Sequence, residues 1–131
     1  MPEYRWWEEH DRLWKELVPA RGQAPTVQGE LVRCAGRLTD EAYRNGNQNW
    51  SPTSGHARML AYVERTILGD DTFDTERQAA IRSDIAEISD YEYPNVGGQG
   101  TCYYNLSEAV VDWCMLHPEP IPREPDPGLR M

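Results

Sequence analysis

The chain has 131 residues, 39% of them hydrophobic, which provides enough apolar side chains for one packed domain and excludes wholesale disorder. The formal net charge of -9 is concentrated in residues 71–131, which hold twelve acidic and four basic side chains, and it predicts repulsion from nucleic acid and from anionic membranes. No apolar run approaches the ~20 residues of a membrane span, and residues 1–6 lack the basic-then-apolar order of a signal peptide. The three scattered cysteines are typical of reduced thiols. We therefore expect a cytoplasmic protein.

The first predicted element is an amphipathic helix over about residues 3–18, ended by Pro19. Its outer face carries charges of both signs three and four residues apart, as on an ordinary solvated surface. The expected inward face consists of Trp6, His10, Leu13, Trp14 and Leu17.

The second predicted helix begins after Thr26, whose hydroxyl is a suitable N-cap, and ends at Gly46. Apolar positions recur at helical spacing over residues 27–42. Its flank carries acidic and basic side chains four residues apart, such as Arg37 and Glu41, and these are interpreted as ion pairs within the helix.

Two further helices are predicted in the middle of the chain. Ser51 followed by Pro52 is a helix-start signal, and the third helix is expected to run from there to about Leu68. The fourth is expected over about 75–89. The inward positions would be His56, Leu60, Val63 and Ile67 in the third helix and Ile81, Ile85 and Ile88 in the fourth.

The last third of the chain is predicted to hold a loop, a helix and a tail. Residues 91–104 contain too much glycine for a helix and are expected to form a loop. The fifth helix is expected over about 106–116, with Leu106, Ala109, Val110, Trp113 and Cys114 inward. Residues 118–131 include five prolines and should be extended, either mobile or laid along the surface. The predicted fold class is all-α, a compact bundle of about five helices in residues 1–117 with a Pro-rich tail.

Two segments in the first half of the chain resemble a known group of proteins. They are Val27-Gln28-Gly29-Glu30-Leu31-Val32-Arg33 and Arg44-Asn45-Gly46-Asn47-Gln48-Asn49-Trp50, and with the residues between them they span about a fifth of the chain. The combination is similar to small acidic helical bacterial proteins of uncharacterised function. The resemblance implies a helical fold and a shared Asn/Trp loop, and it transfers no catalytic residue.

Acidic side chains gather on one flank of the predicted fourth helix and just beyond it. A helical wheel places Glu76, Asp84, Glu87 and Asp90 along this flank and the outer face. Such a stripe favours a basic or nucleic-acid-handling protein as the partner, with no direct contact to nucleic acid or to a membrane. The expected function is that of an acidic protein-binding module, by analogy with immunity, antitoxin-like and anti-defence inhibitors. The alternative is that the acidity only maintains solubility.

Two predicted loops offer further contact residues. The turn after the second helix presents Asn47, Asn49 and Trp50, either as a structural Asx-rich turn with Trp50 covering the core or as an amide-rich recognition loop. Tyr93 and Tyr103 flank the glycine-rich run, and tyrosine commonly supplies contact area at interfaces. These five residues complete the predicted partner-binding set.

No cofactor and no metal are expected. Cys114 and His117 are three residues apart on one helix, but no second pair completes a zinc ligand set. No catalytic constellation is visible either. The alternative to a binding protein is a small enzyme with its site near the Asn45 to Trp50 loop, where Gln28, Glu41 and His56 could converge on a pocket.

Overall fold

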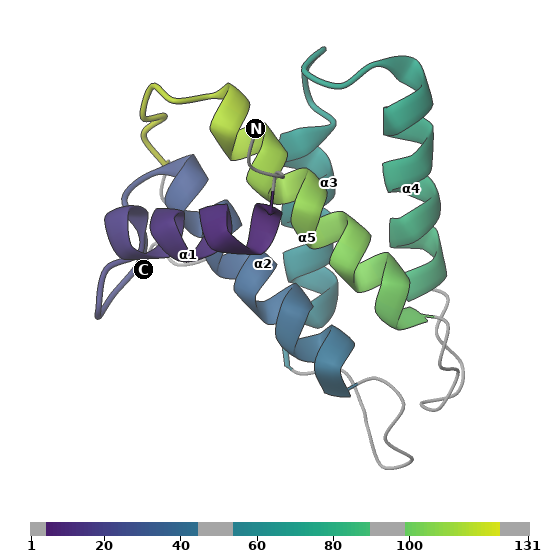
Figure 1. Cartoon of the computed structure of the whole chain (residues 1–131), viewed down its shortest axis with the longest axis horizontal. Helices are drawn as coiled ribbons and strands as arrows, with labels where there is room; N and C mark the ends of the chain where they lie inside the picture. The colour runs from purple at the N-terminus through teal and green to yellow at the C-terminus, as the bar shows by residue number, and fades with distance from the viewer. Residues whose placement is uncertain (1–4, 45–53, 90–98, 124–131) are drawn as a thin grey trace, which may run out of the picture.

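The computed structural model describes residues 5–44, 54–89 and 99–123, and within these ranges the regular structure is entirely helical. Figure 1 shows the helices in chain order. They are α1 (Trp6–Leu17), α2 (Val27–Arg44), α3 (His56–Ile67), α4 (Thr75–Ser89) and α5 (Gln99–Leu116). The predicted all-α bundle of five helices is therefore confirmed for the described residues.

The core lies where α2 and α5 cross, and the other helices pack around this pair (Figure 1). Leu31 and Leu38 of α2 and Val110 of α5 are completely buried. Helix α1 packs across α2, and α4 packs along α5, with its three isoleucines, Ile81, Ile85 and Ile88, inward as predicted. Burial of these apolar side chains is the main favourable contribution to folding.

Helix α1 buries less of its apolar face than its sequence predicts. Leu13 is buried, but Trp14 remains 40% exposed, so the expectation that Trp14 belongs to the core is wrong. Its ring lies at the edge of α2 over Gly36, where an added Cβ would stand 3.0 Å from the ring. One helix crossing another covers only a strip of its apolar face, and Trp14 lies at the margin of that strip.

The start of α2 agrees with the prediction. The backbone N–H of Gly29 donates to Oγ1 of Thr26 at 3.0 Å, which satisfies one of the unpaired amides of the first turn. Gly29 also lets α1 end close by, because a Cβ there would lie 2.7 Å from the carbonyl oxygen of Leu17. A larger residue at this position would force the two helices apart.

Helix α3 begins later than predicted. Its first residue is His56, and it follows Gly55, whose φ of 81° lies in the left-handed region that favours glycine. The expected unbroken helix from Ser51 to about Leu68 is therefore wrong at residues 54 and 55, which form a turn, while Ser51 and Pro52 lie outside the described residues. The inward face is as predicted for Leu60, Val63 and Ile67, whereas His56 is half-buried.

Helix α5 begins earlier than predicted. It starts at Gln99, so the loop expected over 91–104 is wrong from that residue onward. The apolar face extends back to Tyr103, which is only 1% exposed. Burying this ring outweighs the cost of about 1 kcal/mol for one glycine in a helix, here Gly100. The end at Leu116, before Pro118, agrees with the prediction, and so do the five inward residues.

The first part of the tail lies along the beginning of α2. The N–H of Val27 donates to the carbonyl of Ile121 at 2.8 Å, and the N–H of Arg123 donates to that of Pro25 at 3.0 Å. These two bonds flank an isolated bridge between Thr26 and Pro122. Residues 118–123 are therefore laid along the molecule, one of the two arrangements expected for the tail.

Candidate functional site

The predicted acidic stripe is only partly a surface feature. Glu76 and Glu87 are exposed, whereas Asp84 is half-buried, and burial raises the pKa of its carboxyl group above the ordinary value. Its carboxylate accepts hydrogen bonds from the side chains of Cys102 and Asn105, which oppose that rise. Asp90 lies outside the described residues. A docking face on α4 stays a prediction.

The predicted loop contacts fall into two groups. Asn47, Asn49, Trp50 and Tyr93 lie outside the described residues. The prediction that Tyr103 is a contact residue in a loop is wrong, because Tyr103 is a core residue of α5. Its hydroxyl is within hydrogen-bond distance of Nε2 of His56, at 2.9 Å. A ring buried in this way offers no contact area to a partner.

The residues of the enzyme hypothesis do not all converge. Glu41 is 1% exposed and acts electrostatically on half-buried His56, so these two lie near each other. Gln28 is engaged elsewhere, because its side-chain amide holds the backbone of residues 117–121. The structure brings Glu41 and His56 together beside Tyr103 and keeps Gln28 apart from them.

The environment of His56 predicts a pH effect on stability. Burial lowers the pKa of its imidazole below the ordinary 6.5, Arg37 lowers it further, and Glu41 partly opposes the shift. The folded protein therefore binds fewer protons at His56 than the unfolded chain does at pH values just below 6.5. Stability that is fully present above this range is lost as the pH falls through it.

We expect His56→Gln, which keeps a polar group beside Tyr103, to reduce that loss. The measurement is the melting temperature of both proteins between about pH 7.5 and about pH 5.5. The melting temperature of the parent should fall further on acidification than that of the variant. Equal losses in the two proteins would show that His56 does not contribute to the pH dependence.

The cysteine environments disfavour reactive thiols. Burial raises the pKa of Cys34 and of Cys114 to about 12, and that of Cys102 to about 11. A thiol with such a pKa is protonated at neutral pH and is a weak nucleophile. Catalysis through a cysteine would need a different environment.

The histidine near Cys114 has protein partners on both ring nitrogens. Nδ1 of His117 lies 2.8 Å from the carbonyl oxygen of Trp113, and Nε2 lies 3.2 Å from a carboxylate oxygen of Asp70. Its ring also stacks on the indole of Trp113, with centroids 3.7 Å apart. Among the described residues, no group of three or more His, Cys, Asp or Glu side chains is placed to hold a metal ion.

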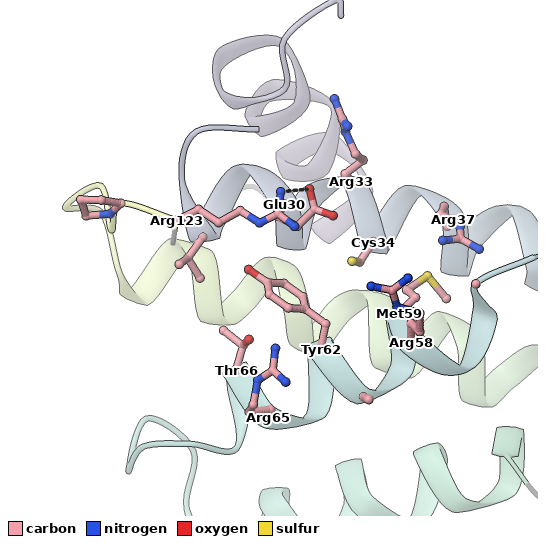
Figure 2. A pocket seen from close by; sticks show the side chains of 14 residues that line it. Glu30, Arg33, Cys34, Arg37, Arg58, Met59, Tyr62, Arg65, Thr66 and Arg123 are labelled. Atoms are coloured by element: carbon pink, nitrogen blue, oxygen red, sulfur yellow. Dashed lines mark ion pairs between the residues drawn. The ribbon is translucent and has the colours of Figure 1, made fainter. Parts of the chain in front are cut away.

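A cleft lies between α2 and α3, closed at one end by the tail (Figure 2). Its volume is about 900 Å³. Cys34, Met59 and Tyr62 form much of its floor. Five arginines line it, and Glu30 is the one acidic residue among the described residues of the lining. They are Arg33, Arg37, Arg58, Arg65 and Arg123.

Several arginines are held in place by the surrounding structure. Arg37 donates to the carbonyl of Ser54 at 2.9 Å, and Arg123 forms an ion pair with Glu30 at 3.5 Å. Arg33 extends away from Tyr62 (Figure 2) and donates to the carbonyl of Gly22 at 2.9 Å. The cleft thus combines guanidinium groups from α2, α3 and the tail.

Tyr62 occupies the centre of this cluster (Figure 2). The guanidinium carbons of Arg65 and Arg123 lie 5.6 Å and 5.9 Å from its ring centroid, within the range of cation–π attraction. Its hydroxyl is buried and makes no well-formed hydrogen bond among the described residues. Burial raises the pKa of this hydroxyl, and the positive charge of Arg123 is the main effect that opposes the rise. Tyr62 is therefore a neutral hydroxyl group with two guanidinium groups close to its ring.

Sequence reasoning missed this cleft. The available signal was the spacing of arginines on two helices, with Arg33 and Arg37 four residues apart and Arg58 and Arg65 seven apart. The first pair was interpreted as part of an ion-pair ladder within its helix. Nothing in the spacing indicates that the two helices face each other across a hollow.

Comparison with known proteins supplies no further assignment. No family model, curated protein or solved structure matches the chain. Among the described residues, none of the helices has the length and apolar composition that crossing a membrane requires.

Proposed function

We propose that the protein binds a small phosphate-bearing organic molecule in the cleft between α2 and α3. The observation that carries this proposal is a cleft whose described lining holds five arginines and one acidic residue, Glu30, in a protein whose net charge is -9. Like charges brought together in this way repel one another, and an anion in the cleft would relieve that repulsion.

The chemistry of the lining favours phosphate and a small ligand. A guanidinium group presents a planar set of donors that matches phosphate oxygens, and charged hydrogen bonds of this kind are among the strongest in proteins. The Tyr62 ring and Met59 provide an apolar floor for an organic group. A volume of about 900 Å³ suits a small molecule. A long polyanion would meet the net negative charge of the rest of the protein.

The site is better suited to binding than to covalent chemistry. The Cys34 thiol is held protonated by its pKa of about 12, and the Glu30 carboxylate is engaged with Arg123. Neither group is therefore prepared to act as nucleophile or base toward a bound phosphate. Glu41 and His56 are not among the residues that line the cleft, and they take no part in this proposal.

The test is calorimetric titration with inorganic pyrophosphate and with adenosine diphosphate. The double variant Arg58→Gln with Arg65→Gln should bind each probe at least about tenfold more weakly than the parent, because it removes two charged donors. Both side chains are exposed, so the fold should survive, as circular dichroism can verify.

A matched control separates the site from overall charge. Arg12→Gln with Arg82→Gln removes the same charge from α1 and α4, away from the cleft, and should change the affinities by less than about twofold. Absence of binding to the parent at millimolar probe, or an equal loss in the two double variants, would contradict the proposal.

A further inference from the structure

A second hollow lies on the other flank of α2, between it and α1. Its volume is about 360 Å³, and its lining includes Trp6, Trp7, Asp11, Asp40 and Tyr43. Trp7 is 52% exposed and Tyr43 is 85% exposed. Large aromatic side chains left in water at one place are typical of an interaction surface. We call these five residues the aromatic groove.

The aromatic groove is built on a fixed base. The rings of Trp6 and Trp7 meet edge to face with centroids 6.0 Å apart. The centroid of the Trp6 ring also lies 6.5 Å from that of Tyr104 in α5. Gly36 leaves room between the helices because it has no side chain. The two tryptophan rings, held in this way, lose little conformational freedom on binding, which favours their use as contact residues.

The charges around the groove select for a cation. Asp11 and Asp40 are exposed carboxylates within the lining, and no arginine or lysine of the described residues lines it. His10 also lines the groove, with its Nδ1 3.8 Å from a carboxylate oxygen of Asp11. Aromatic faces attract guanidinium and ammonium groups, and a carboxylate beside the ring strengthens that preference. An anionic partner would be repelled from the same place.

We infer that the aromatic groove binds an arginine-containing basic segment of a partner protein. An arginine side chain would lie against the rings of Trp7 and Tyr43 and pair with the carboxylates of Asp11 and Asp40. This places the basic partner, which the overall acidity predicts, on α1 and α2 and not on the α4 stripe. It is independent of the proposed anion site, since the groove and the cleft occupy opposite flanks of α2.

The test uses a capped peptide of alternating arginine and glycine, about ten residues long, titrated calorimetrically. The parent should bind it, and a peptide with glutamate in place of arginine should not bind. The double variant Asp11→Asn with Asp40→Asn should bind the arginine peptide at least about tenfold more weakly than the parent. Tyr43→Ala should also weaken binding of the arginine peptide, and it should not affect the fold because this side chain is 85% exposed.

The matched control is Glu76→Gln with Glu87→Gln, which removes the same charge from the α4 stripe. It should change the affinity by less than about twofold. An equal or larger loss in this control would overturn the inference in favour of the α4 stripe, and so would absence of peptide binding to the parent at millimolar concentration. Pyrophosphate titrated into the groove variants reports separately on the cleft, so failure of one proposal is distinguishable from failure of the other.

Discussion

Replacing Leu38 with alanine is expected to lower the free energy of unfolding by about 2–5 kcal/mol. Leu38 has no exposed surface and belongs to the α2 face that packs on α5 at the centre of the molecule. The change removes buried apolar atoms and leaves a cavity that the two crossing helices cannot fully close. A loss of this size is a large fraction of the stability of an ordinary domain.

The measurement is urea unfolding followed by circular dichroism, with the slope of the transition compared between proteins. Leu116→Ala is the control, because this leucine is 60% exposed at the end of α5 and its truncation should cost no more than about 0.5 kcal/mol. Equal stability of the two variants would show that the α2–α5 contact is not the core of the fold.

Gln28→Leu is expected to lower the free energy of unfolding by about 1–3 kcal/mol. The Gln28 amide donates to the carbonyls of His117 and Glu119 at 2.8 and 2.7 Å, and its Oε1 accepts from the N–H of Ile121 at 3.0 Å. The glutamine is 3% exposed, so leucine would leave these three backbone groups without their partner. The variant should also loosen residues 118–123.

Hydrogen exchange at Ile121 and Arg123, whose amides are bonded in the folded protein, measures this loosening directly. The control Gln23→Leu changes an exposed glutamine and should leave exchange and stability unaltered. If Gln28→Leu matches the control, the tail is held by its two backbone bonds to 25–27 and by the ion pair of Arg123 with Glu30, without a measurable contribution from Gln28. Since Arg123 lines the cleft, the variant is also expected to weaken pyrophosphate binding under the proposed function.

Secondary structure followed from the sequence where local signals and burial agree. The spacing of Ile81, Ile85 and Ile88 identified α4 and its inward face, and Thr26 marked the start of α2. Local signals failed where packing outweighed them. The glycine-rich approach to α5 becomes helical from Gln99 because Tyr103 is buried in the core, a gain that the local composition does not register.

The candidate sites depended on tertiary structure almost entirely. The net charge of -9 predicted a basic partner, but Arg58 and Arg65 form a cleft with Arg33 and Arg37 only because α3 packs beside α2. Likewise, the helical period placed Trp14 inward, and the crossing of α1 over α2 decided that its ring stays at the margin. Periodicity reports which face of one helix is apolar, because each residue turns the helix by a fixed angle. Which helices meet, and which charges therefore stand across a hollow from one another, is settled by the packing of side chains far apart in the chain.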